Sequence, residues 1–118
     1  DKAEQAYQYA LGIKPEGKEV LANLALLYHQ QQDSDKTIEQ LEKLIKLEPM
    51  HFNANYLLGL HYFKKKQYEQ MEAAYQRAIA IKPDLSEAHY NLGMAYFLQT
   101  RYNEAINQRT FVGQRQWR

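Results

Sequence analysis

Four histidines are the side chains of this 118-residue sequence best suited to metal or acid–base chemistry: His29, His51, His61 and His89. A metal site on a helix commonly places two histidines four residues apart, because both rings then lie on one face. None of these histidines are spaced in that way, and no carboxylates of a metal-binding arrangement stand beside them. The sequence therefore predicts no metal site and no cofactor.

Other catalytic signatures are absent as well. The chain has no cysteine, which excludes disulfides, thiolate nucleophiles and cysteine-ligated zinc. It has no glycine-rich phosphate loop of the GxxxxGK[ST] type. Acidic residues such as Glu39, Glu42, Glu69 and Glu72 fall on faces expected to be solvated, which does not favour acid–base catalysis by a carboxylate pair. We therefore expect no catalytic residues and no enzymatic activity.

Two sets of large apolar side chains recur at i, i+4, i+7, the spacing that places residues on one face of a helix. They are Tyr56, Leu60 and Phe63 in one segment and Tyr90, Met94 and Phe97 in the next. At about 100° per residue, the first set clusters within about 60°, while Leu58, Gly59 and Tyr62 as a group point more than about 90° away. Each helix is thus apolar on two faces, one more than packing in a single core requires.

Amides accompany these stripes and could hydrogen-bond the backbone of a bound peptide. The equivalent face of the preceding segment is less apolar, since it carries Ala22, Leu26 and His29. The predicted peptide-binding residues are Asn23, Leu26, Asn53, Tyr56, Leu60, Phe63, Tyr90, Asn91, Met94 and Phe97. The alternative, that the aromatic residues merely pack one helix against the next, stays open at this point.

An internal period of 34 residues must position these side chains. The proline-ended segments ALGIKP, LIKLEP and AIAIKP, which close at Pro15, Pro49 and Pro83, stand 34 residues apart. A period of this size is typical of helical repeat proteins. Matching small and aromatic residues follow the same period: Leu24, Ala25 and Tyr28; Leu58, Gly59 and Tyr62; Leu92, Gly93 and Tyr96.

This pattern resembles the tetratricopeptide repeat (TPR) family over nearly all of residues 1–108. The resemblance implies an all-α, right-handed solenoid of antiparallel helix pairs, in which the first helix of each pair lines a concave groove. The two aromatic stripes would then face that groove. Some TPR domains grip chaperone C-terminal carboxylates with a Lys and Asn clamp, but Ala22 and Leu26 stand in two of those places here. A receptor for acidic tails is therefore disfavoured.

The period divides the chain into one TPR domain, residues 1–118. Its expected parts are the second helix of a partial repeat (1–17), two full repeats (18–51 and 52–85), a partial final repeat (86–112) and a tail (113–118). About seven helices are expected: Asp1–Ile13, Lys18–Gln31, Lys36–Leu47, Asn53–Lys65, Tyr68–Ile81, Ser86–Gln99 and one from Tyr102. Residues from Arg109 onward depart from the pattern, as a solvated end or a tail foreign to the repeat would.

Two local features of the sequence predict specific details of the structure. Asp33 or Ser34 can cap the helix that follows, because their side-chain oxygens accept backbone N–H bonds. A glycine inside a helix costs about 1 kcal/mol relative to alanine, so the recurrence of Gly59 as Gly93 predicts a close helix–helix contact at both positions.

The composition limits the kinds of partner that we expect this protein to bind. A formal net charge of +1 offers no broad basic field for nucleic acid or lipid, and no stretch approaches the roughly 20 apolar residues of a membrane span. The composition does not determine the cellular compartment, with a cytoplasmic location slightly favoured. We expect a protein–protein interaction scaffold that binds a peptide or helical segment. The alternatives are a homo-oligomer assembled through the open face of Asp1–Ile13 and an accessory repeat segment of a larger enzyme.

Overall fold

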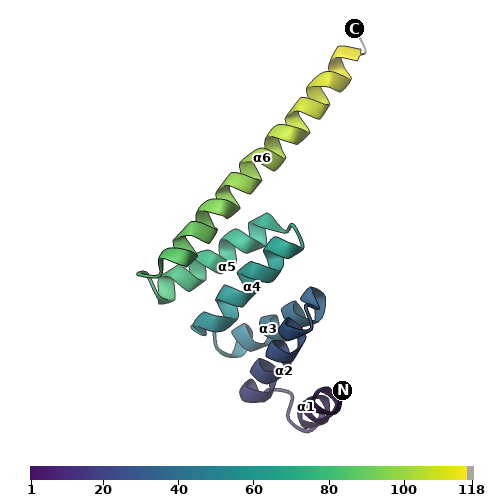
Figure 1. Cartoon of the computed structure of the whole chain (residues 1–118), viewed down its shortest axis with the longest axis vertical. Helices are drawn as coiled ribbons and strands as arrows, with labels where there is room; N and C mark the ends of the chain where they lie inside the picture. The colour runs from purple at the N-terminus through teal and green to yellow at the C-terminus, as the bar shows by residue number, and fades with distance from the viewer. Residues whose placement is uncertain (117–118) are drawn as a thin grey trace.

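The computed structural model describes the backbone of residues 1–116 and the side chains of residues 1–104 and 106. Within that part the chain forms helices and no strands: α1 (Lys2–Ile13), α2 (Lys18–Gln30), α3 (Ser34–Leu47), α4 (Phe52–Lys64), α5 (Tyr68–Ile81) and α6 (Ser86–Gln116). Each helix packs mainly against its neighbours in sequence, which gives an elongated array of 64 × 34 × 21 Å (Figure 1). The expected all-α solenoid is confirmed.

The helices begin and end for local reasons. Asp33 caps α3 by accepting a bond from the backbone N–H of Lys36 at 3.1 Å, as expected. The residues before Pro15, Pro49 and Pro83 all have extended φ near −130°, because a following proline disfavours the helical conformation. The proline period therefore ends a helix in every repeat.

The core of the array lies between paired helices. In the pair α4–α5, an ideal Cβ built on Gly59 would lie 2.6 Å from the ring carbon Cζ of Tyr75. Tyr75 is fully buried, so its ring fits the space that only a glycine leaves. The predicted close contact is confirmed at Gly59. It is wrong at Gly93, where an added Cβ would meet none of the described neighbours within 4 Å.

Gly93 is open because the last helix does not turn back. The turns after α2 and α4 each contain one residue at φ 59°, Gln32 and Lys66. The equivalent residue after a further 34 positions is Thr100, and a β-branched side chain is strongly disfavoured at positive φ. Thr100 instead stays helical, and its hydroxyl donates to the carbonyl of Tyr96 at 3.1 Å.

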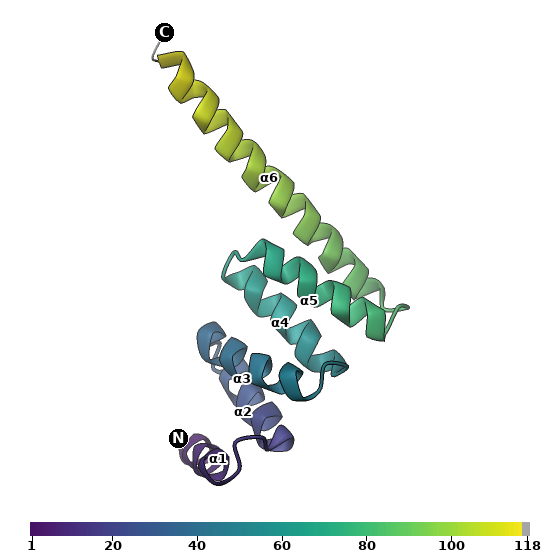
Figure 2. The same cartoon turned by 180° about the vertical axis from the view of Figure 1, so that it is seen from behind.

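The expected last helix pair is therefore wrong: one helix, α6, runs from Ser86 to Gln116, and the described residues hold six helices instead of about seven. Seen from behind in Figure 2, α6 packs along α5 and then projects beyond the rest of the molecule. The side chains of the predicted tail, residues 113–118, and of the off-pattern residues from Arg109 lie outside the described part. The repeat boundaries stay predictions.

One buried hydroxyl gives a direct test of this core. The Tyr75 hydroxyl is buried without a hydrogen-bond partner among the described residues, and burial raises its pKa. Because an unpaired buried polar group costs about 1–3 kcal/mol, Tyr75→Phe is expected to raise the free energy of unfolding by about 1 kcal/mol. Urea denaturation followed by circular dichroism measures the difference.

The matched control is Tyr62→Phe. The Tyr62 hydroxyl donates to Glu42 Oε1 at 2.6 Å, so its removal is expected to lower stability by about 1 kcal/mol. Equal losses in both variants would show that the Tyr75 hydroxyl is hydrogen-bonded in solution.

Candidate peptide-binding groove

The two apolar faces of α4 have different surroundings. Leu58 is 0% exposed and Tyr62 8% exposed, because these side chains pack in the core with Gly59. Phe63, on the other face, is 42% exposed. Tyr56 and Leu60 are half-buried and pack against the edge of the core. The predicted division of α4 into a core face and a second apolar face is therefore present.

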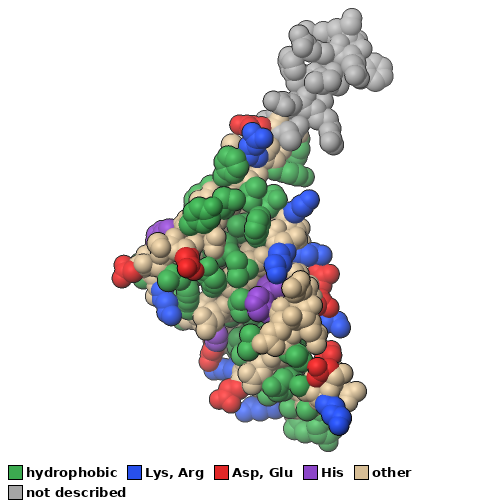
Figure 3. All heavy atoms as spheres, in the orientation of Figure 1, with side chains coloured by type: hydrophobic (Ala, Val, Ile, Leu, Met, Phe, Trp, Pro, Cys, Tyr) green, Lys and Arg blue, Asp and Glu red, His purple; other side chains and the backbone are tan. Residues whose placement is uncertain are grey.

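The second stripe, on α6, is more open to solvent. Tyr90 is 70% exposed and Phe97 57% exposed, while Met94 is half-buried against the core. Figure 3 shows hydrophobic side chains exposed over α6 and over the helices beneath it. The exposed aromatic residues of α6 are thus available to a ligand.

A pocket of about 430 Å³ lies between α2 and α4. It is lined by Ala22, Asn23, Leu26, His29, Leu41, Leu44, His51, Asn53, Ala54, Tyr56 and Leu57. Four of the predicted peptide-binding residues meet here: Asn23, Leu26, Asn53 and Tyr56. Apart from the two histidines, no ionisable residue other than Tyr56 lines this pocket, so its surface favours apolar side chains and neutral hydrogen-bonding groups.

A second pocket, of about 500 Å³, lies between α4 and α6 and is lined by Tyr56, Ser86, Glu87, Tyr90 and Asn91. Tyr56 lines both pockets, so they lie next to each other, and we call the pair the groove. The Asn91 amide Nδ2 donates to the Tyr56 hydroxyl at 3.1 Å. This bond ties α6 to α4 at the junction of the pockets.

The remaining predicted residues line neither pocket: Leu60, Phe63, Met94 and Phe97. They lie one and two turns further along α4 and α6 from Tyr56 and Tyr90. The structure therefore brings six of the ten predicted residues together and leaves four on the continuation of the same helix faces.

Tyr56 has a structural part as well. Its ring lies 5.7 Å from that of Phe52 in a stacked arrangement and 5.6 Å from that of Tyr75 in an edge-on one, measured between centroids. Such pairs contribute about 0.5–1.5 kcal/mol each beyond burial. Tyr56 therefore packs within the fold as well as lining both pockets, whereas the largely exposed Tyr90 makes no comparable aromatic pair in the described part of the chain.

A buried polar cluster beside the groove was not predicted. His61 of α4 is 0% exposed, its Nε2 lies 2.8 Å from His29 Nδ1, and its Nδ1 lies 2.9 Å from Ser34 Oγ. Burial, together with the nearby His29 and Lys64, lowers the pKa of His61 to about 4. His61 is therefore neutral at pH 7, and it links three helices. The 34-residue period could have shown that a polar residue at position 61 is unusual, since the equivalent positions hold the apolar residues Leu27 and Ala95.

The described residues contain no group of three or more His, Cys, Asp or Glu side chains that could hold a metal ion. Nor is any helix among them both long and apolar enough to cross a membrane. The fold defines a helical repeat protein, with pockets and exposed aromatic side chains on the face of α2, α4 and α6.

Two family models match the chain: one described as a tetratricopeptide repeat over residues 18–51, and one described as a TPR repeat over residues 59–100. Together they cover more than half of the sequence, and the chain belongs to the TPR family. A comparison with curated protein sequences gave no match. TPR repeats are generally non-catalytic interaction modules, and this chain is a protein-interaction scaffold.

Solved structures agree with that assignment. A crystal structure of MamA is 30% identical, with a TM-score of 0.77, and the match covers 88% of this chain and 61% of MamA. A second MamA structure, AMB-1, is 21% identical with a TM-score of 0.79, over 91% of this chain and 58% of MamA. This chain thus spans about three fifths of the MamA chains that it matches.

The first TPR of Spaghetti (RPAP3), bound to the HSP90 peptide SRMEEVD, shares the fold at 16% identity and a TM-score of 0.73. The match covers 82% of this chain and 77% of that one.

Proposed function

We propose that the groove formed by α2, α4 and α6 binds a peptide or a short helix of another protein. Its apolar anchors are Tyr90, which lines the α4–α6 pocket, and Phe97, which lies outside the pockets two turns further along the same face of α6. The observation that carries the proposal is the pair of neighbouring pockets that share Tyr56 and are flanked by aromatic residues that the core leaves exposed. Large aromatic side chains that lose water on binding supply most of the affinity at such interfaces.

The chemistry of the groove restricts the ligand. The α2–α4 pocket has no lysine or arginine in its lining, and Glu87 is the one charged residue that lines the α4–α6 pocket. An acidic segment like the peptide bound by RPAP3 would find no cation in either pocket. The groove therefore suits a segment with apolar anchors, whose backbone can hydrogen-bond the amides of Asn23 and Asn53.

The test uses peptides selected from a random phage-displayed library on the 118-residue protein. Their affinities are then measured by fluorescence polarisation for wild type and for Tyr90→Ala/Phe97→Ala. The two substitutions together should reduce the binding free energy by about 2 kcal/mol or more, which raises Kd at least about 30-fold. Both side chains are largely exposed, so the melting temperature should change little.

Tyr102→Ala is the matched control, because Tyr102 is a tyrosine of α6 that is 61% exposed but lines a pocket with Lys66–Gln70 outside the groove. It should leave the affinity within about twofold, as expected for a side chain outside the contact. Peptides that bind Tyr90→Ala/Phe97→Ala as tightly as wild type would refute the groove as the binding site.

A further inference from the structure

The α4–α6 pocket offers aromatic rings and hydrogen-bond acceptors, and no lysine, arginine or histidine is among the described residues that line it. Its charged member is Glu87, whose side chain is exposed and forms no ion pair with any described side chain. A carboxylate that stands beside aromatic rings without a cation of its own is a partner for a positively charged group.

One wall of this pocket is held in place by the fold. The Asn91 amide Nδ2 donates to the Tyr56 hydroxyl at 3.1 Å, which leaves Asn91 Oδ1 as an acceptor without a hydrogen-bond partner in the described part of the chain. The Tyr56 ring is held by Phe52 on one side and by Tyr75 on another. The pocket therefore presents a second acceptor oxygen, from a side chain that is already positioned.

Tyr90 supplies a free aromatic ring. It is 70% exposed and forms no aromatic pair with a described residue. It follows Glu87 by three positions, a spacing that makes the two side chains neighbours on the surface of α6. A basic side chain can thus lay its methylenes or its planar head on the Tyr90 ring while its charge reaches the Glu87 carboxylate.

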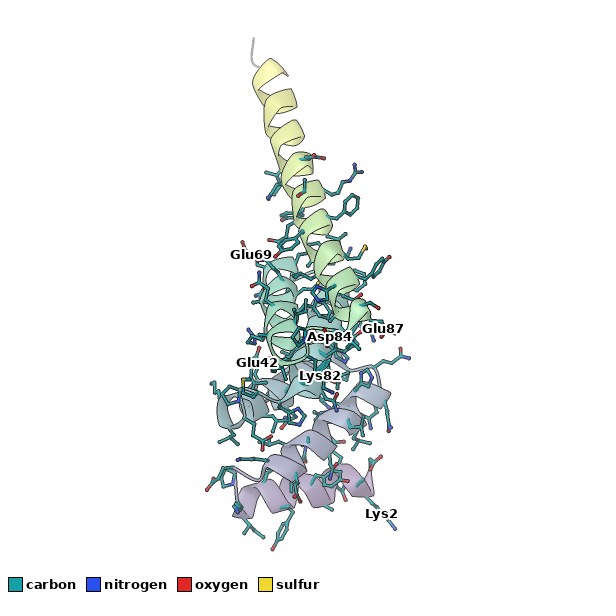
Figure 4. All side chains as sticks on the ribbon, turned by 90° about the vertical axis from the view of Figure 1, so that its left-hand side faces the viewer. Lys2, Glu42, Glu69, Lys82, Asp84 and Glu87 are labelled. Atoms are coloured by element: carbon teal, nitrogen blue, oxygen red, sulfur yellow. The ribbon has the colours of Figure 1, made fainter. Side chains whose placement is uncertain are left out.

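A ring beside the pocket already holds a cation of the chain itself. The Lys82 ammonium lies 4.5 Å from the centroid of the Phe52 ring, and Lys82 does not line the pocket. Figure 4 labels Lys82, Asp84 and Glu87 around the junction of α5 and α6. Because two carboxylates accompany one lysine in residues 82–87, this junction keeps a negative charge that favours a basic ligand.

We propose that the α4–α6 pocket binds an arginine side chain of the segment held in the groove, an inference that rests on the proposed function. The guanidinium donates to the Glu87 carboxylate and to Asn91 Oδ1, and its plane lies against the Tyr90 ring. Arginine suits this site better than lysine because its planar fork can bond two acceptors and stack on an aromatic ring at the same time. The partner segment therefore carries an arginine beside its apolar residues.

The test begins with the peptides selected on the 118-residue protein whose binding is lost in Tyr90→Ala/Phe97→Ala. These peptides should share an arginine at one position. One of them is synthesised with arginine and with citrulline, a neutral side chain of nearly the same shape. At low salt, citrulline should raise Kd at least about fivefold in fluorescence polarisation. The difference should shrink as the salt concentration rises, because salt screens an exposed ion pair.

Variants of Glu87 test the other side of the same contact. Glu87→Gln should weaken binding of the arginine peptide at least about threefold and leave the citrulline peptide within about twofold. Glu87→Lys should reverse the preference, so that a peptide with glutamate in place of arginine binds it more tightly than the arginine peptide does.

Glu69→Gln is the matched control. Glu69 is exposed and is the second residue of α5, as Glu87 is of α6, so both substitutions remove the same favourable charge from the first turn of a helix. Glu69 lines the separate pocket with Gln99 and Tyr102, and Figure 4 labels it at the start of α5. Glu69→Gln should bind the arginine peptide as wild type does.

Two outcomes would overturn the arginine site: groove-dependent peptides that share no arginine, or an arginine peptide that binds Glu87→Gln as tightly as wild type. Equal melting temperatures of Glu87→Gln and Glu69→Gln would show that a loss of affinity does not come from unfolding. Failure of the groove itself gives a different result, because peptides would then bind Tyr90→Ala/Phe97→Ala as tightly as wild type.

Discussion

Gly59→Leu is expected to lower the free energy of unfolding by about 2 kcal/mol or more, as overpacking of a filled core does. Gly59→Ala should already cause a steric clash, because its Cβ would lie 2.6–2.8 Å from three ring carbons of Tyr75. Tyr75 is fully enclosed and its ring is rigid, so α4 and α5 must move apart. Denaturant unfolding of both variants measures the loss.

Gly93→Ala provides the matched control at the same position of the next repeat. The space there is open, and alanine is favoured over glycine within a helix by about 1 kcal/mol. We therefore expect Gly93→Ala to stabilise α6 or to leave the stability unchanged. A loss at Gly93 equal to the loss at Gly59 would mean that backbone conformation, and not the Tyr75 ring, sets the requirement for glycine.

The first helix pair suggests how to rescue Gly59→Ala. At the positions of Gly59 and Tyr75 it carries Ala25 and Leu41, both buried. Tyr75→Leu alone should destabilise by leaving a cavity, but together with Gly59→Ala it recreates the smaller pair. The double variant should thus be more stable than the sum of the single losses predicts, with a coupling of about 1 kcal/mol or more. Additive losses would refute a direct contact.

The sequence predicted most of this fold because its signals are local. Apolar spacing and the prolines placed five helices with bounds within about two residues, and the cap at Asp33 follows from a side chain that bonds its own helix. The two apolar faces of α4 were predictable for the same reason. The assignment of one of them to peptide binding stays a proposal.

Two kinds of feature were not predicted from the sequence. Some depend on contacts between residues that are far apart in the chain, and one depends on a backbone conformation that a particular residue disfavours. The period placed a turn at residue 100, but threonine at that position disfavours the positive φ that Gln32 and Lys66 adopt, and α6 continues. Tyr56 could not be known to pack on Tyr75, because helical spacing shows the direction of a side chain and not its neighbour.

The His61 cluster escaped for the same reason. A search for paired histidines along one helix does not find His29 and His61, which lie 32 residues apart in sequence and 2.8 Å apart in space. A better signal was a polar residue at a position that the other repeats fill with Leu27 and Ala95.

This cluster gives the second large effect: the protein should lose stability as the pH falls from 6.5 towards 4. Burial, His29 and Lys64 hold the pKa of His61 at about 4 in the folded state, below the ordinary value of 6.5 expected in the unfolded chain. Between these values the unfolded chain binds more protons than the folded one, so stability is complete above pH 6.5 and declines with acid. With ~1.4 kcal/mol per pKa unit, the full loss is of order 3 kcal/mol.

Chemical denaturation at closely spaced pH values measures the slope, and the interval from pH 5 to 6.5 separates His61 from the carboxylates, whose ordinary pKa values of about 4 lie below it. His61→Gln should flatten the curve in this interval, even though a buried amide lowers the overall stability. His89→Gln, at an exposed histidine, should keep the wild-type slope. A slope unchanged by His61→Gln would show that His61 is not held neutral by its burial beneath α2 and α3.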